Sequence, residues 1–360
     1  MGVEAHKLKP LLLRSLNKNQ LLILRELALN FNRSLTSFLM EISEKRNIPL
    51  STLKLNAKVL RNLGLICVGE LNGKRFAGLS NLGRLVLNIL DGVEDSRGDL
   101  RRESIDIEFL RRKTDLVRKH IIRMLRAAGS GHLGGSLSIV EVLVALYFAK
   151  MAHDPSNPSW KGRDILILSK GHAAPALYAV LAEAGYIPVS LLSRLRELGS
   201  PLQGHPELTI PGIEMVSGSL GQRLSIGVGI ALGMRLRNTN SRVYVILGDG
   251  ELNEGQIWEA CMTASKYQLD NLTAIVDRNG FQQEGPTEEV KPLEPLDRKW
   301  EAFGWNVLEI NGHNMKQILW ALDEVERVWG RPSVIIAKTK KGKGVPEAEG
   351  NNHYHNRVPL

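Results

Sequence analysis

Short apolar runs alternate with helix-length segments over the C-terminal two thirds of the chain. Aliphatic and β-branched residues fill positions 243–247 and 272–276, and a segment with helical spacing, 253–267, separates them. Two such runs on either side of a helix predict a βαβ unit, whose strands lie parallel in one sheet. The other elements predicted here are strands at 164–168, 305–310 and 332–338 and helices at 105–125, 139–150 and 315–329. The pattern predicts an α/β fold, a parallel sheet with helices on both faces.

The first 95 residues follow a different pattern. Hydroxyl side chains satisfy free N–H groups where helices begin, so Ser34 and Ser51 each predict a helix start. The elements predicted for this segment are helices at 11–30, 35–46 and 51–64, a hairpin that turns at Asn72-Gly73, and a helix at 81–90. This order of elements resembles the winged helix-turn-helix family. We therefore expect a small α+β domain at 1–95, a polar linker at 96–108 and a second domain at 109–360.

The chain is basic, with 47 Lys and Arg against 38 Asp and Glu and a formal net charge of +9. Residues 1–100 hold fifteen of the basic and nine of the acidic side chains, so most of the excess lies there. In the winged-helix resemblance, the helix predicted at 51–64 is the recognition helix, and it carries Lys54, Lys58 and Arg61. The predicted hairpin is the wing, and it carries Lys74 and Arg75. DNA binding through residues 1–95 is one interpretation of this pattern. The alternative is a solvated face on a domain that docks against protein.

Composition excludes several classes of protein. No apolar run approaches the roughly 20 residues that a membrane-spanning helix needs, and the N-terminus lacks the apolar core of a signal peptide. Two cysteines, Cys67 and Cys261, fit neither a disulfide framework nor a zinc site. We therefore expect a soluble protein in a reducing, cytoplasmic setting, with no membrane partner.

Polar residues follow two of the predicted strands at the point where each strand ends. Asp249 comes directly after the first apolar run, in Gly248-Asp249-Gly250, and Asn279 follows the second. The carboxyl ends of parallel strands meet at one edge of the sheet, where ligands bind. Carboxylate and amide oxygens suit Mg²⁺ that keeps bonds to phosphates, and Gly250 lets phosphate oxygens approach the backbone. The alternative is a buried turn with an incidental Asp and Asn.

The segment from Gly248-Asp249-Gly250 to Asn279 matches the thiamine-diphosphate motif, and the stretch GDGELNEGQIWEA resembles transketolase. The resemblance covers about residues 110–360. It implies thiamine diphosphate and Mg²⁺ as cofactors, with Asp249, Asn279 and the backbone carbonyl of Phe281 as metal ligands. It also implies that Asn279, Gly250 and Gln283 face the cofactor.

Three histidines each lie beside a glycine in a predicted loop: His132, His172 and His205. Any one of them alone fits a structural histidine. The transketolase resemblance implies instead that all three line the cofactor and substrate cleft, where imidazole donates, accepts or shuttles a proton. It also implies that Lys170 and His355 lie at the diphosphate, together with His172.

Further matches to the family lie in two loops. Gly218 and Leu220 match a loop that contacts the cofactor. Glu254 matches a glutamate that crosses the subunit interface and couples paired active sites; the alternative is an ordinary first-turn glutamate favoured by the helix dipole. The chain departs from the family pattern at Arg223 and Asn356, which both replace glycine, and at Leu133, which replaces proline. Arg223 either adds a diphosphate or subunit contact or crowds the site.

No segment matches the family's second, pyrimidine-binding domain, which carries the glutamate that activates the cofactor. The resemblance therefore implies the N-terminal subunit of a split transketolase, inactive alone, which transfers a two-carbon ketol unit between sugar phosphates together with a separate C-terminal chain. We expect a homodimer or an α2β2 hetero-oligomer. Two alternatives remain open: a DNA-binding regulator that retained the cofactor-binding fold, and a component of another two-part thiamine-diphosphate enzyme.

Overall fold

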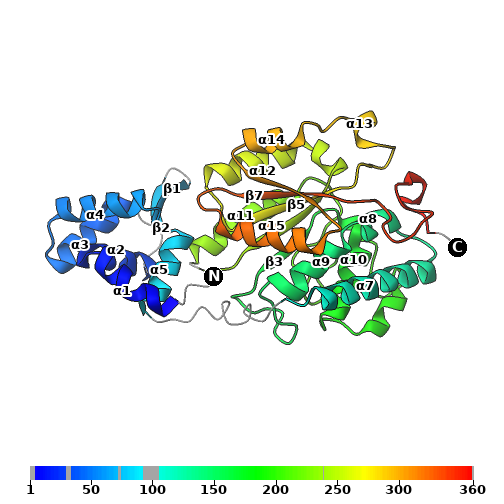
Figure 1. Cartoon of the computed structure of the whole chain (residues 1–360), viewed down its shortest axis with the longest axis horizontal. Coiled ribbons are helices and arrows are strands. Elements are labelled where there is room, and N and C mark those ends of the chain that lie inside the picture. The colour runs from blue at the N-terminus through cyan, green and yellow to red at the C-terminus, as the bar shows by residue number, and fades with distance from the viewer. Residues whose placement is uncertain (1–4, 30–33, 72–73, 92–104, 238, 359–360) are drawn as a thin grey trace. The chain divides into compact units, whose positions relative to one another are not determined.

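The computed structural model describes residues 5–29, 34–71, 74–91, 105–237 and 239–358 (Figure 1). The chain divides into two compact units: residues 1–103 with 233–240, and residues 104–232 with 241–360. Most of the predicted linker lies outside the described residues. Its last two positions, 107 and 108, already belong to a helix.

The N-terminal unit contains the predicted order of helices, hairpin and helix. Its elements are α1 (Ala5–Ser15), α2 (Lys18–Leu29), α3 (Leu35–Arg46), α4 (Leu50–Asn62), β1 (Ile66–Leu71), β2 (Lys74–Leu79) and α5 (Asn81–Asp91). Aliphatic residues of these elements, with Phe38, form one buried core. The strands pair antiparallel up to Leu71 and Lys74, and the turn predicted at Asn72-Gly73 lies outside the described residues. Membership of the winged-helix family stays a prediction.

The single helix predicted at 11–30 is wrong, because the chain breaks between α1 and α2. The Asn17 N–H donates to Gln20 Oε1 at 3.0 Å, and the Gln20 N–H donates to Asn17 Oδ1 at 3.0 Å. This reciprocal pair is a capping box, which satisfies free N–H groups at a helix start. The Ser34 cap of α3 is confirmed, since Ser34 Oγ accepts from the Ser37 N–H at 3.1 Å. The third helix begins at Leu50, one residue before Ser51.

The C-terminal unit is built on a five-stranded sheet. Its strands are β3 (Ile165–Leu168), β4 (Val243–Gly248), β5 (Leu272–Arg278), β6 (Asn306–Asn311) and β7 (Ser333–Lys338). They lie in the order β3-β4-β5-β7-β6, and every neighbouring pair is parallel. The predicted α/β class and parallel sheet are confirmed. The central strands β4 and β5 are buried along nearly their whole length, which explains their continuous apolar runs.

Helices cover both faces of this sheet (Figure 1). The helices of the described chain from residue 105 on are α7 (Ile107–Ala128), α8 (Leu133–Leu137), α9 (Val140–Ala145), α10 (Ala174–Glu183), α11 (Arg223–Leu236), α12 (Gly255–Lys266), α13 (Thr287–Val290), α14 (Leu296–Ala302) and α15 (Met315–Arg327). Tyr244 and Ile246 of β4 join the core formed with α7, α9, α10 and α15. Val245 points to the other face, where a Cβ on Gly227 of α11 would lie 2.6 Å from its Cγ2. Alternate strand residues therefore pack against different helix layers.

Two predicted helices differ in detail from the structure. The helix expected at 139–150 is α9 followed by a π-helical turn, Leu146–Lys150. The helix expected from residue 253 is preceded by a 3₁₀ turn, Gly250–Asn253, which carries the chain from β4 into α12. The stretch Leu133–Lys150 is long and apolar enough to cross a membrane by composition alone, but 89% of it is buried inside this unit. It belongs to the core of the fold.

Candidate functional site

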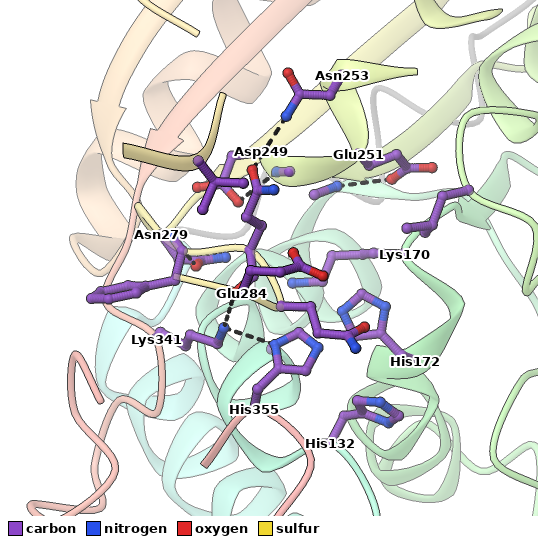
Figure 2. A pocket seen from close by; sticks show the side chains of 18 of the residues that line it. His132, Lys170, His172, Asp249, Glu251, Asn253, Asn279, Glu284, Lys341 and His355 are labelled. Carbon is purple, nitrogen blue, oxygen red and sulfur yellow. Dashed lines mark hydrogen bonds between the residues drawn. The ribbon is translucent and has the colours of Figure 1, made fainter. Parts of the chain in front are cut away.

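A cleft of about 600 Å³ lies at the carboxyl ends of β3, β4 and β5 (Figure 2). All thirteen residues predicted from the sequence as site residues line it: His132, Lys170, His172, His205, Gly218, Leu220, Asp249, Gly250, Glu254, Asn279, Phe281, Gln283 and His355. These residues come from loops spread over more than two hundred positions of the chain. The fold brings them together, and their individual roles remain predictions.

Asp249 and Asn279 lie next to each other at the tips of β4 and β5. Asp249 Oδ2 accepts the N–H of Gly280 at 2.6 Å, and its Oδ1 accepts the N–H of Gly250 at 2.9 Å. Asn279 Oδ1 accepts the Phe281 N–H at 3.1 Å, which fixes the orientation of its amide. The parallel register of β4 and β5 produces this proximity, because it pairs the last residue of β4 with the penultimate residue of β5.

The environment of Asp249 favours a cation. The side chain is buried, and burial, followed by the charge of Asp277, raises its pKa to about 6. Arg278 provides partial compensation, with its Nη1 3.3 Å from Asp249 Oδ2. In the described part of the chain no group of three His, Cys, Asp or Glu side chains forms a metal site. A cation here therefore depends on mixed carboxylate, amide and carbonyl oxygens, a donor set that suits Mg²⁺.

Gly250 permits the tight turn after Asp249. A Cβ at this position would lie 2.6 Å from the Cβ of Gln282, closer than real Cβ contacts come. Only glycine therefore fits between the end of β4 and the loop that follows β5. This close packing leaves the backbone of the Gly250 turn in the wall of the cleft.

A buried ion pair lies beneath the predicted metal site. Lys170 Nζ donates to Asp277 Oδ2, which also accepts from Ser138 Oγ at 2.7 Å and Asn279 Nδ2 at 2.9 Å. Burial favours the neutral form of Asp277, but the charge and hydrogen bond of Lys170 outweigh it and hold the pKa of this carboxyl below its usual value. Sequence reasoning gave Asp277 no role, although it stands two residues before Asn279. The sequence alone does not show that Asp277 is buried.

Three half-buried histidines form a triangle on the opposite side of the cleft (Figure 2). The ring centroids of His132 and His172 are 5.2 Å apart, and that of His355 lies 5.5 Å and 5.6 Å from them. Burial is the largest cause that lowers their pKa values, to about 4 for His132, about 3 for His355 and well below normal for His172. All three are therefore neutral imidazoles near neutral pH. His205, at the rim, also has a lowered pKa, from burial and then from Arg196.

Lys341 is a site residue that sequence reasoning missed. It is 1% exposed, and its Nζ lies 2.8 Å from His355 Nδ1 and 2.7 Å from Asn352 Oδ1. Because an ammonium only donates, His355 Nδ1 accepts and the proton of this neutral ring lies on Nε2. Burial, followed by the charge of Lys170, lowers the pKa of Lys341 to about 8. The cleft thus has an ammonium group beside the histidine triangle.

Glu251 was missed as well. Its buried carboxylate accepts the N–H groups of Gly221 and Gly248 at 2.9 Å each and the hydroxyl of Ser169. Burial raises its pKa. Glu251 therefore joins the ends of β3 and β4 to the loop that carries Gly218 and Leu220. Exposed Glu254 lies at the cleft rim against the same loop, where a Cβ on Gly221 would be 2.6 Å from the Cβ of Glu254.

The departures from the family pattern leave the cleft open. Arg223 begins α11, and its Nε donates to the carbonyl of Val216 at 2.7 Å, outside the cleft lining. It therefore neither crowds the cleft nor contacts its interior. Leu133 is fully buried in the core, and Asn356 is exposed next to His355.

The strand tips of this parallel sheet hold a buried carboxylate, and neutral histidines and two lysines line the same cleft. These features define an α/β domain that binds a phosphate-bearing cofactor. A family model described as "Transketolase, thiamine diphosphate binding domain" matches residues 111–359. The chain therefore belongs to the transketolase family, and it carries the thiamine-diphosphate-binding domain of that family. The match does not extend to the N-terminal unit.

Named relatives include transketolase subunits. The chain is 48% identical over 258 residues to SqwG, the 6-deoxy-6-sulfo-D-fructose transketolase subunit of a Clostridium species, covering 71% of this chain and 93% of that relative. It is 42% identical over 255 residues to an apulose-4-phosphate transketolase subunit of Phocaeicola vulgatus, covering 71% and 91%. The crystal structure of transketolase from Campylobacter jejuni matches with a TM-score of 0.68 and 35% identity, covering 71% of this chain and 41% of that one.

Proposed function

We propose that this chain is the thiamine-diphosphate- and Mg²⁺-binding subunit of a split transketolase, which transfers a two-carbon ketol unit between sugar phosphates. The observation that carries the proposal is the pattern of coverage. The chain matches more than nine tenths of each subunit relative but about two fifths of the one-chain transketolase. A separate C-terminal subunit supplies the pyrimidine-binding half and its activating glutamate, and the chain forms a homodimer or an α2β2 hetero-oligomer. We expect it in the cytoplasm.

The residues of the cleft fit the proposed cofactors. Asp249, Asn279 and the carbonyl of Phe281 would hold Mg²⁺ against the diphosphate, since burial leaves the Asp249 carboxylate in need of a cation. The ammonium of Lys341 and the imidazole of His355 would hold the diphosphate from the other side, in contact with each other at 2.8 Å. Thiamine diphosphate supplies a carbanion at its thiazolium C2 when bound.

The histidine triangle fits a polyhydroxy substrate. Neutral imidazoles each offer one donor and one acceptor, so His132 and His172 can hold hydroxyl groups without adding charge. His205 at the rim would meet the sugar where it leaves the cleft, and Glu254, also at the rim, would meet the partner subunit. The family match and these hydroxyl-binding groups favour a transketolase over a decarboxylating dehydrogenase component. The substrates in the names of the relatives include a sulfonated ketose and a phosphorylated one, so both classes belong in the assay.

Reconstitution tests this proposal. We expect no ketol transfer by the purified chain alone and full activity when a C-terminal chain with the pyrimidine-binding half is added, with thiamine diphosphate and Mg²⁺ present. The matched control is the Asp249→Asn chain with the same partner, which we expect to be inactive. Activity of the unmixed chain, or no activity with that partner and either substrate class, would overturn the proposal.

The N-terminal unit supports a second function, DNA binding. Lys54, Lys58 and Arg61 are exposed along one side of α4, and among the described residues no acidic side chain pairs with them. Phosphate contacts by such a row give binding that weakens steeply with salt. A mobility-shift assay on the full chain, with the Lys54→Ala/Lys58→Ala double variant as control, tests this. Absent or salt-insensitive binding would refute it and favour docking against protein, through the exposed Leu55 and Val59 beside the basic row.

A further inference from the structure

Arg196 adopts a backbone conformation that non-glycine residues rarely take. Its φ is +62°, a left-handed value it shares among the described non-glycine residues with Asn47 and Gln268. Such a conformation persists only where the surroundings hold it in place. Here the N–H of Arg196 donates to the carbonyl of Leu202 at 2.7 Å, which closes a tight loop. The strained residue lies beside the cleft but is outside its lining.

The side chain of Arg196 joins two loops that each carry a cleft histidine. Its Nη1 donates to Ser130 Oγ at 2.9 Å, two residues before His132. Its guanidinium also packs against Gly204, the residue before His205: a Cβ on Gly204 would be 3.4 Å from Nη2 and 3.5 Å from Nε. A single side chain thus holds the loop of His132 against the loop of His205.

Tyr178 of α10 also contacts the loop that carries His205. Its hydroxyl lies 3.0 Å from the carbonyl of Gln203 and 2.8 Å from that of His205. Tyr178 and Arg196 therefore both contact the short stretch from Gln203 to His205.

We propose that Arg196 is a positioning residue, which clamps the His132 and His205 loops together at the rim of the cleft and so orients both imidazoles toward the substrate. It acts through these histidines and does not touch the cofactor. Its charge supports the same role. Burial lowers the pKa of His205 most, and the charge of Arg196 lowers it next. The pKa of His132 is lowered by burial, then by His205 and then by Arg196. The pKa of His355 has no contribution from Arg196.

Histidine titration by NMR in the isolated chain, without cofactor, tests this directly. In Arg196→Gln we expect the pKa values of His132 and His205 to rise by about half a pH unit, while His355 stays unchanged as an internal reference. Arg194→Gln is the matched control, because Arg194 is an exposed neighbour that pairs with Glu197. It should leave all these histidines unchanged. No rise at His132 and His205, or an equal rise at His355, would overturn the proposal.

Two further variants separate positioning from folding. Arg196→Gly tolerates the left-handed backbone and should fold, yet it should show the same titration shifts as Arg196→Gln. Arg196→Lys keeps the charge but not the guanidinium contact with Gly204. In the reconstituted enzyme we expect it to lower kcat/KM by about ten-fold or more with nearly normal histidine titration. Only this last measurement rests on the proposed transketolase function, so failure of that function leaves the NMR result decisive.

Discussion

Replacement of Asp249 by asparagine removes a single charge from the predicted metal site with little change in shape. Asp249 is 1% exposed, and burial raises its pKa from 3.8 to about 6. The shift of about two units corresponds to roughly 3 kcal/mol, the free energy by which the folded protein is destabilised when this carboxylate is ionised at neutral pH. A bound divalent cation offsets that destabilisation. The neutral amide of asparagine causes no such destabilisation.

The stability of the metal-free chain should change little in Asp249→Asn. Removal of the buried charge stabilises the chain by roughly 3 kcal/mol. The amide nitrogen, however, leaves one of the N–H groups of Gly250 and Gly280 without an acceptor, which costs about 1–3 kcal/mol. We therefore expect unfolding free energies within about 2 kcal/mol of the parent. Cation-dependent cofactor affinity should fall by at least about 100-fold, since even groups that only support metal ligands contribute 10–100-fold.

Calorimetric titration of thiamine diphosphate in excess Mg²⁺, alongside chemical unfolding, measures both quantities. Glu289→Gln is the matched control, because it removes one negative charge from an exposed position of α13 nearby. The pH dependence has a fixed sign. Since the folded pKa is raised to about 6, affinity of the parent should decline as pH falls through 6, while protonation of Asp249 removes its own destabilisation of the metal-free chain. Unchanged cofactor affinity in Asp249→Asn would refute the metal assignment.

Three other predictions follow from particular contacts. Lys341→Met should weaken diphosphate binding by about ten-fold or more, and affinity of the parent should decline as pH rises through about 8, where Lys341 loses its charge; calorimetry at several pH values measures both. Gly250→Ala places a methyl group against Gln282 and should destabilise the fold by about 1–3 kcal/mol in thermal melts. Trp300→Ala empties a fully buried position and should cost about 3–5 kcal/mol in urea unfolding, with the cofactor site retained. Normal stability of either variant would contradict the packing described.

The proximity of Asp249 and Asn279 was predictable from the sequence alone, because it follows from one rule about parallel strands. Buried parallel strands appear as apolar runs, and their carboxyl ends share one edge, so Asp249 and Asn279 had to lie close together. The convergence of His132, His172 and His355 was different. Their spacing in the chain contains no geometric information, and only the resemblance to transketolases placed them in one cleft.

The buried ionic groups escaped prediction for a common reason. Glu251 and Lys341 belong to residue types that are mostly solvent-exposed, and most of their partners lie in other loops of the chain. Nothing local in the sequence distinguishes Lys341 from the neighbouring Lys340, which is exposed and pairs with Glu349. The break after α1, in contrast, was readable from Asn17 and Gln20, whose three-residue spacing is that of a capping box.

The Glu251 carboxylate holds three parts of the cleft wall together. One carboxylate receives hydrogen bonds from Ser169, Gly221 and Gly248, which belong to three separate stretches of backbone. Loss of any one of the three stretches from this junction leaves a buried carboxylate without one of its hydrogen-bond donors. We therefore expect the three stretches to exchange their amide hydrogens with solvent together, as one cooperative block, so that the pocket is either wholly assembled or wholly absent.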